Sequence, residues 1–570
     1  MFLVGLLIES AQEVDRFEIL APTVLIRNPL TLLAGVVQVQ HRRDRVHAKS
    51  INVILVQPEH RTRHQEAAHF SATVIEDVCF PVGMEALPRV RVFVKMCPVE
   101  ICQPVTVGRE VRRYPVEDHP DPMKPSSAYA NKEDSRKAIE YFLKHLERQP
   151  DDLEVRWLLN LAYMTTGGYP DKVPARYLIS PKVFESSEDV GRFRDVAQEA
   201  GLVSFSAAGG VIVDDFENIG RFDVVTSSFY SCGPMHFFHN NGDGTFTEQA
   251  AKAGLADQMG GLNSLQTDYN NDGCIDILVL RGGWEIPQRK SLLRNNCDGT
   301  FTDVTVASGL GEPTSTQAGV WVDINNDGFL DLFVGNEGQP TQLFLNKGDG
   351  TFEDISVSAG VHRTMFTKGV AAGDYDNDGY PDLYVSNLGA DNILYHNNHD
   401  NTFTEVTQVA GVPGPGRGFA TWFFDYDNDG LPDIFATSYF LSLDETARTY
   451  LNLPHNATTL KLYKNLGNGK FHDVTSEVGL DKVYMPMGSN FGDIDNDGFL
   501  DIFLGTGNPS YATLKPSVLL HNKGGKRFVD VTTSSGTGEW HKGHGVAFAD
   551  LDNRGDEDII FRSRRRDGWG

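Results

Sequence analysis

The chain has 570 residues, a formal net charge of -26 and 56 glycines. This length exceeds what one ordinary hydrophobic core organises, so we expect several domains or a repeat architecture. No stretch reaches the roughly 18 consecutive apolar residues of a membrane-spanning helix. The acidic excess also disfavours nucleic acid, whose phosphates need basic residues. We therefore expect neither a transmembrane segment nor a nucleic-acid partner.

Residues 1–122 differ from the rest of the chain in charge and pattern. Residues 1–120 hold 14 basic and 14 acidic side chains, so the whole acidic excess lies in residues 121–570. The segment shows no repeat, and its apolar opening lacks the basic stretch of a signal peptide. A start codon placed too early, with Met123 as the alternative start, or a disordered segment would explain the contrast. We assign residues 1–122 no function.

Residues 123–184 predict a helical pair followed by a linker. Apolar residues at helical spacing predict one helix over 135–148 and a second over 153–164, with Pro150 between them. Ala138, Phe142 and Pro150 stand at offsets that resemble a tetratricopeptide repeat (TPR). Because such repeats need about three copies for stability, both a hairpin packed on its neighbour and a peptide-binding groove remain open.

From residue 185 onward the chain repeats itself. One phrase, Phe-x-(Asp/Glu)-(Val/Ile)-Thr followed by Ala/Ser-Gly, predicts a short strand. A second phrase, Asn-x-Gly-(Asp/Asn)-Gly-x-Phe, precedes several copies and predicts hairpin turns, because Asn and Gly tolerate positive φ. The first phrase begins at Phe193, Phe246, Phe301, Phe352, Phe403, Phe471 and Phe528.

The third phrase is an acidic loop, represented by residues 374–382. Carboxylates stand at loop positions 1, 3, 5 and 9, and Gly379 at position 6 permits a sharp bend. Alternate acidic positions in a tight turn point inward at one place, and this all-oxygen arrangement suits Ca²⁺. Turn chemistry alone explains Asp-Asn-Asp-Gly, but it does not require an acid at position 9, inside the following strand.

Five loops carry oxygen donors at all four positions, so about five Ca²⁺ ions are predicted. Two further loops, which begin at Asp215 and Asp550, have Ile219 and Arg554 at position 5 and are expected to bind weakly or not at all. The predicted ligands are Asp268, Asn270, Asp272 and Asp276; Asp323, Asn325, Asp327 and Asp331; Asp374, Asp376, Asp378 and Asp382; Asp425, Asp427, Asp429 and Asp433; and Asp493, Asp495, Asp497 and Asp501.

Seven acidic loops at intervals of 51 to 68 residues predict a mainly β fold, a seven-bladed β-propeller over residues 185–570. A glycine four to seven residues before each loop fits innermost strands that crowd together. The last repeat ends after two strands, as in a truncated blade, and a strand over 193–196 is expected to help complete it.

These residues resemble the FG-GAP/VCBS repeat of integrin α propellers. The pairing of Phe-x-Asp-Val-Thr-x-x-Ala-Gly-Leu with Gly-Asp-Tyr-Asp-Asn-Asp-Gly-Tyr-Pro-Asp-Leu-Tyr-Val looks more narrowly like the ASPIC/UnbV, cartilage acidic protein-like group. The resemblance covers about residues 185–562. It implies calcium-binding loops and a secreted, periplasmic or cell-surface scaffold that acts in adhesion. The C-terminal ASPIC/UnbV module has no counterpart in the sequence, so functions of that module are not implied.

The leading hypothesis is a calcium-binding scaffold that binds a protein or a glycan, because no catalytic motif stands out. The insertion at 440–459 breaks the repeat length and is the favoured recognition element. The alternative is a propeller enzyme, a polysaccharide lyase or hydrolase, with His541 and His544 near its channel. In a third hypothesis the helical pair docks the partner. The six cysteines show no metal-ligand spacing and are expected to be scattered small residues.

Overall fold

The computed structural model describes residues 131–204, 209–228, 233–284, 286–507, 515–540 and 542–564, together with four two-residue strands nearer the N-terminus. The chain divides into two compact units, Met1–Arg112 and Arg113–Gly570. In the first unit, β1 pairs with β3 and β2 with β4, all antiparallel. These strands are β1 (Glu18–Ile19), β2 (Val36–Val37), β3 (Val39–Gln40) and β4 (Ile51–Asn52).

Two helices open the described part of the second unit. They are α1 (Glu133–Arg148) and α2 (Leu153–Thr166), followed by the short 3-10 helix η3 (Pro181–Phe184). Asp152 starts α2, because its side chain accepts the N–H of Val155 at 3.0 Å. The predicted helical pair is confirmed, while its likeness to a TPR stays a prediction.

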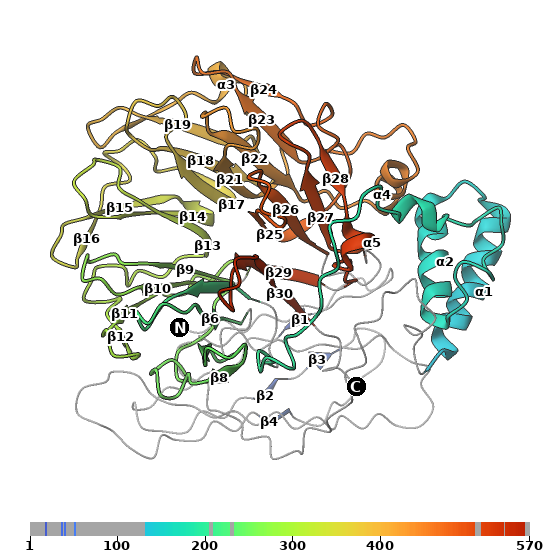
Figure 1. Ribbon diagram of the computed structural model, residues 1–570, viewed down its shortest axis with the longest axis horizontal. Helices are drawn as coiled ribbons and strands as arrows, with labels where there is room; N and C mark the ends of the chain where they lie inside the picture. Colours follow the sequence, from blue (N-terminus) through green and yellow to red (C-terminus); the bar gives the residue numbers. More distant parts are fainter. Residues whose placement is uncertain are drawn as a thin grey trace. The chain divides into compact units, whose positions relative to one another are not determined.

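The rest of this unit is mainly β, with antiparallel sheets that follow one another along the chain in a propeller-like blade arrangement. Figure 1 shows them fanned around β9, β13, β17, β21, β25 and β29. The strands are β5 (Val211–Asp214), β6 (Asp223–Thr226), β7 (His236–Asn240), β8 (Phe246–Glu248); β9 (Asn263–Thr267), β10 (Asp276–Leu280), β11 (Ser291–Asn295), β12 (Phe301–Asp303); β13 (Thr316–Val322), β14 (Asp331–Pro340), β15 (Gln342–Asn346), β16 (Phe352–Asp354); β17 (Thr364–Gly373), β18 (Asp382–Asn387), β19 (Ile393–Asn397), β20 (Phe403–Glu405); β21 (Gly418–Phe424), β22 (Asp433–Ser438), β23 (Lys461–Asn465), β24 (Phe471–Asp473); β25 (Pro486–Gly492), β26 (Asp501–Thr506), β27 (Val518–Asn522), β28 (Phe528–Asp530); β29 (Lys542–Ala549) and β30 (Asp558–Arg564).

The repeated phrases occupy fixed places in these sheets. Each Phe phrase from Phe246 onward begins the fourth strand, and each acidic loop joins the first strand to the second, as predicted. β14 also pairs with β17, so the third and fourth sheets merge at one edge. Three short helices lie between strands: α3 (Thr407–Ala410), α4 (Leu443–Tyr450) and α5 (Thr532–Ser535).

The hydrophobic core is divided among the gaps between neighbouring sheets. Val225 and Ile277, from the first and second sheets, share one cluster, and the same arrangement recurs between each later pair. Another cluster joins Val211 of β5 to Ala547 of β29. The first strands likewise pack in the order β5, β9, β13, β17, β21, β25 and β29, and β29 packs on β5. Apolar side chains are therefore buried between every pair of neighbouring sheets, and also between the last sheet and the first.

Glycines allow the first strands to approach this closely. A Cβ on Gly369 would lie 2.3 Å from the carbonyl oxygen of Phe419 in β21, and one on Gly545 would lie 2.8 Å from the backbone nitrogen of Val211 in β5. Both distances are shorter than real Cβ contacts allow. The predicted crowding of first strands is confirmed at these positions.

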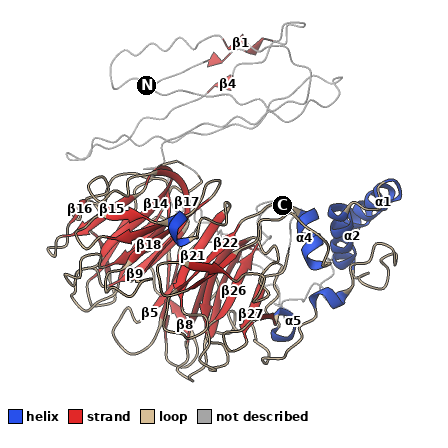
Figure 2. Ribbon diagram, turned by 90° about the horizontal axis from the view of Figure 1, so that it is seen from above, coloured by secondary structure: helices blue, strands red, loops and turns tan. Residues whose placement is uncertain are grey.

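The insertion at 440–459 joins the sheets to the helical pair. Its helix α4 buries Leu443, Ala447 and Tyr450 against α2, where the rings of Trp157 and Tyr450 lie 5.6 Å apart. Figure 2 shows α4 beside α2. Because these side chains are covered within the chain, they are not available to a ligand.

The predicted strand over residues 193–196 is wrong. These residues form no strand, and β29 pairs only with β30 among the described residues. The segment nevertheless lies at the expected place, because Phe193 packs against the cluster of Phe503 and Val546 and donates its N–H to Ser535 at 2.9 Å. The backbone contact forms without a strand ladder.

Candidate metal centres

The first aspartate of each acidic loop closes the turn. In the 374–382 loop, Asp374 Oδ1 accepts the N–H of Asp378 at 3.0 Å, and Oδ2 accepts that of Gly379 at 2.8 Å. Gly379 has a φ of 91°, which suits glycine. The same two bonds occur in the other six loops at 2.6–3.1 Å. Part of the repeated pattern therefore serves the turn itself.

The ninth-position aspartate begins the second strand and is buried in all five predicted loops. Asp382 Oδ2 accepts the N–H of Tyr375 at 3.1 Å, and Oδ1 accepts that of Asn397 at 2.9 Å. Burial, together with the charges of Asp376 and Asp378, raises the pKa of Asp382 to about 8 although its two backbone hydrogen bonds oppose the increase. Burial raises the pKa of the other four to about 7. A nearby divalent cation would offset the cost of these buried charges.

The third and fifth positions bring more oxygens to the same place. Ligand oxygens of Asp374, Asp376 and Asp378 lie within 4.8 Å of one another. Asp376 Oδ1 and Asp427 Oδ1 are buried without a hydrogen-bond donor among the described residues. Such oxygens cost free energy unless a cation satisfies them. The residues of these loops therefore fit a hard divalent cation such as Ca²⁺.

In two loops the third-position asparagine presents nitrogen rather than oxygen. Asn270 Nδ2 donates to Asp272 Oδ2 at 2.9 Å, and Asn325 Nδ2 donates to Asp327 Oδ2 at 3.0 Å. The predicted metal ligand is the amide oxygen, which would take this place if the amide turned over. Ligation by Asn270 and Asn325 stays a prediction.

A side chain from the third strand faces several acidic loops, and we call its place the facing position. It is the residue immediately before the last asparagine of that strand, and its chemistry changes from sheet to sheet. Sequence analysis missed it because the contacting residues are far apart in the chain, as shown by Lys464, which lies 35 and 37 residues after Asp429 and Asp427. The facing position is occupied by His239, Arg294, Leu345, His396, Lys464 and His521 in the six four-stranded units.

In the 425–433 loop the facing position supplies a cation. The Lys464 ammonium forms ion pairs with Asp427 and with Asp429, the latter at 2.8 Å. Although partial burial opposes it, the pairing with these carboxylates raises the pKa of Lys464 well above its usual value. This loop has a complete predicted ligand set and also carries its own counter-charge.

In other loops the facing position supplies an imidazole. His396 Nδ1 lies 3.4 Å from Asp376 Oδ2 and 3.3 Å from Asp382 Oδ1. The two incomplete end loops also contain fixed partners: Glu217 pairs with His239, and Arg554 Nε donates to Asp552 Oδ1 at 2.7 Å. Arg554 thus places a cation of the protein beside a loop carboxylate.

Asparagines at two positions of the repeat connect acidic loops to neighbouring sheets. The fourth-position Asn326, with a φ of 58°, donates from Nδ2 to the carbonyl of Gly379 in the next loop at 2.8 Å. The last asparagine of the third strand reaches the other way: Asn397 Nδ2 donates to Ile324 O at 2.8 Å. Sequence analysis assigned the third-strand asparagine only to a hairpin turn, so its link between sheets was missed.

Equivalent bonds recur between most neighbouring sheets, including the last and the first. Asn240, in the first sheet, donates from Nδ2 to the carbonyl of Leu551 in the 550–558 loop at 2.8 Å. Five fourth-position asparagines and six third-strand asparagines make such bonds among the described residues. The acidic loops are therefore linked to one another by backbone and amide hydrogen bonds.

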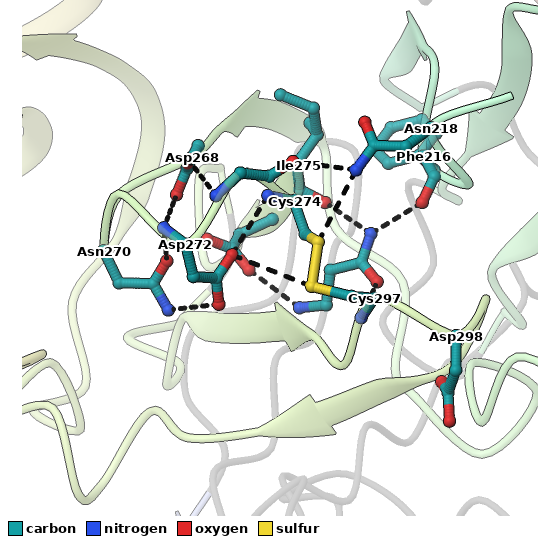
Figure 3. Close-up of a disulfide and its surroundings, with 12 residues drawn as sticks. Phe216, Asn218, Asp268, Asn270, Asp272, Cys274, Ile275, Cys297 and Asp298 are labelled. Carbon is teal, nitrogen blue, oxygen red and sulfur yellow. Dashed lines mark hydrogen bonds between the residues drawn. A yellow bond between two sulfur atoms is a disulfide. The ribbon is translucent and has the colours of Figure 1, made fainter. Parts of the chain in front are cut away.

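In the 268–276 loop, a disulfide connects loop position 7 to the hairpin between the third and fourth strands. Cys274, at loop position 7, is bonded to Cys297 in the hairpin between β11 and β12. Figure 3 shows the pair beside Asp272 and Asn218. In the 374–382 loop the corresponding contact is Tyr380 stacked on His399, with ring centres 4.1 Å apart. The prediction that all six cysteines are scattered is wrong for this pair, since 23 residues separate partners that only the blade brings together.

The sheets and loops together define a propeller-type repeat protein with an acidic turn between the first and second strands of each repeat. The family model for the FG-GAP-like repeat matches residues 215–279, 268–334, 323–385, 379–436 and 450–504. The chain is similar to cartilage acidic protein 1 of Homo sapiens and of Mus musculus. Each is 29% identical over 240 residues, or 40% of this chain. The chain therefore contains FG-GAP-like repeats and, over part of its length, is similar to cartilage acidic protein 1.

These matches span about a third of the length of the relatives, 35% and 36% respectively. Among solved structures, the chain is similar to BBS1N in complex with ARL6DN, at 10% identity and a TM-score of 0.37 over 64% of this chain and 94% of that one. It is also similar to the rhamnogalacturonan lyase PL11 of Bacillus licheniformis, at 14% identity and a TM-score of 0.35 over 63% and 70%.

Within the described part of the chain, no helix has both the length and the apolar character needed to cross a membrane. This agrees with the sequence, which contains no long apolar run.

Proposed function

We propose that this protein is a calcium-binding, extracytoplasmic scaffold built on a closed seven-bladed propeller that binds a protein or glycan partner. The observation that carries the calcium proposal is the convergence of carboxylate oxygens in the 374–382 loop, where a buried oxygen of Asp376 has no hydrogen-bond donor in the described part of the chain. Four other loops share the ligand register. Secretion, periplasmic location or display at the cell surface follows from the family resemblance, and millimolar external Ca²⁺ would fill even weak sites.

The contacts between the last and first sheets support ring closure. β29 packs on β5. Asn240 of the first sheet donates to the 550–558 loop of the last sheet, just as Asn295 of the second sheet donates to Phe216 in the loop of the first. Phe193 donates to Ser535 as Phe246 donates to Ala200. We propose that β29, β30 and the segment around Phe193 form the seventh blade, with calcium holding neighbouring loops together.

The edge opposite the acidic loops is the proposed partner surface. Trp284 follows β10 there with a φ of 69°, which is rare for a bulky residue, and its side chain is 40% exposed. Its N–H donates to Glu337 Oε2 at 2.7 Å, and its indole N–H donates to Gln317 at 2.5 Å. Lys368 lies 4.0 Å from the ring centre. A firmly held, partly exposed indole suits stacking on a sugar face or anchoring a protein side chain.

The second candidate function is a polysaccharide lyase or hydrolase, and it is supported by the residues beside Trp284. Lys368 and Glu337 form a buried ion pair beneath Trp284. Burial lowers the pKa of Lys368 to about 8, which suits proton transfer. Of the histidines named for this activity, His541 lies outside the described residues, and His544 lies in the crowded first strand β29.

Thermal melting with Ca²⁺ against chelator tests the scaffold proposal. A cation that binds the folded state must raise the melting temperature, so we expect a large decrease on chelation and recovery with Ca²⁺. An equal melting temperature in both solutions would refute calcium stabilisation. Turnover of acidic polysaccharides with Ca²⁺ present, lost in Lys368→Met while the melting temperature holds, would favour the enzyme. Glycan or protein binding without turnover, lost in Trp284→Ala, would favour the scaffold.

A further inference from the structure

The 493–501 loop differs from the 374–382 loop, where the facing His396 side chain is 29% exposed, because its own facing imidazole is almost fully buried. His521 is 3% exposed, and neither of its ring nitrogens makes a hydrogen bond within the described residues. Nε2 lies 3.1 Å from Asp495 Oδ2. Ligand atoms of His521, Asp495 and Asp497 all lie within 4.8 Å of one another. One nitrogen and two carboxylates therefore point at a common place.

The second ring nitrogen of His521, Nδ1, lies near a carboxylate from a segment distant in sequence. Glu188 Oε2 lies 3.5 Å from His521 Nδ1, and Glu188 is itself held by Lys523 at 3.1 Å. A carboxylate on one ring nitrogen fixes the tautomer that leaves the other nitrogen free to bind a metal, and this arrangement is common behind metal-bound histidines.

Ca²⁺ takes oxygen ligands, whereas imidazole suits zinc and neighbouring transition metals. We propose that the 493–501 loop binds a transition-metal dication of the Zn²⁺ class through His521 Nε2, Asp495 and Asp497, with Glu188 positioning the imidazole. The inference rests on the proposed binding of divalent cations by the acidic loops. It gives one loop a metal preference different from that of the 323–331 loop, where Leu345 occupies the facing position.

The rival explanation is that His521 is protonated and serves as a fixed cation, as Lys464 does in its loop. An imidazolium between Asp495 and Glu188 would satisfy both carboxylates without metal. The two explanations predict opposite responses to Zn²⁺, because an imidazolium has no lone pair to donate.

The test uses full-length protein without a histidine tag, stripped of metal and dialysed against excess Ca²⁺ with micromolar Zn²⁺. Bound metals are then counted by mass spectrometry. We expect His521→Leu, which copies Leu345, to lose one equivalent of Zn²⁺ relative to wild type. Glu188→Gln should weaken zinc binding by about 10- to 100-fold. His472→Leu, at an exposed histidine paired with Glu477, is the matched control and should keep the wild-type zinc count.

Equal zinc counts in wild type and His521→Leu would overturn the inference. If calcium is still bound in that experiment, the proposed function survives; if neither metal binds, the proposed function fails as well. If His521→Leu does not fold, X-ray absorption spectroscopy of the wild-type protein with one equivalent of Zn²⁺ identifies the metal ligands instead. An imidazole in the first shell that weakens in Glu188→Gln supports the site, and an oxygen-only shell overturns it.

Discussion

The 374–382 and 425–433 loops have aspartate at the same four positions and form the same turn, yet different side chains face them. In the first, His396 lies 3.3–3.4 Å from two carboxylate oxygens. In the second, the Lys464 ammonium contacts Asp427 and Asp429 directly. The second loop thus carries a lysine cation beside its carboxylates, whereas the first has imidazoles there, with His399 Nε2 2.6 Å from Asp378 Oδ2. Because of this difference, we expect the two loops to depend on bound metal to different degrees despite their identical ligand pattern.

The largest expected effect comes from the position where the two loops are alike. Asp382→Ala and Asp433→Ala each leave two buried N–H groups without an acceptor. At about 1–3 kcal/mol for each unsatisfied group, we expect each variant to lose roughly 2–6 kcal/mol of unfolding free energy, measured in urea with Ca²⁺ present. A loss in Asp433→Ala well below that in Asp382→Ala would show that the ninth position does not play the same structural role in both.

The pH dependence of the metal-free protein is expected next in size. Burial raises the pKa of Asp382 to about 8 and that of Asp433 to about 7, whereas an unfolded aspartate titrates near 3.9. Between these values the folded state holds more protons, so its stability falls as pH rises from about 4 to about 8. Melting of resin-stripped protein should show this fall, and saturating Ca²⁺ should reduce it. Stripped protein that gains stability over this range would contradict the account.

Lys464→Met should make the two loops behave alike. Removing the ammonium takes away a competitor for Asp427 and Asp429 and leaves their charges unpaired. We expect calcium affinity at this loop to rise about tenfold or more, equivalent to about 1.4 kcal/mol, and the chelated variant to melt below wild type. Calorimetric titration against Ca²⁺ measures the change. Unchanged affinity would mean that lysine and metal do not share the loop.

The smallest expected effect concerns the links between loops. Asn326→Ala removes one exposed amide bond to Gly379 and should cost about 1 kcal/mol, seen as a small decrease in the urea midpoint. Asn398→Ala removes two bonds within its own hairpin, one donated to Thr402 and one accepted from Thr404, and serves as a control that leaves the links between loops intact. A loss in Asn326→Ala no greater than in the control would show that this link does not stabilise the ring.

Repetition made much of this molecule predictable. The acidic loops, the fourth strands that begin at each Phe phrase and the crowded glycines all recur in register, so each copy supported the others. What sequence did not reveal depends on contacts between residues far apart in the chain: Lys464 against Asp427, Cys274 against Cys297, and Asn240 against Leu551. Their partners are 23 to 311 residues apart, and no local period connects them. The prediction of a strand at 193–196 was wrong because a repeated sequence phrase does not guarantee a neighbouring strand with which to form a ladder.

Equilibrium dialysis of the purified, metal-stripped chain against radioactive Ca²⁺ tests the central claim most directly. With zinc absent, the account predicts about five bound ions per chain, one for each loop with a complete register, the weakest at the lysine-paired loop, and one fewer in Asp376→Ala. No bound calcium, or an unchanged number in Asp376→Ala, would contradict it.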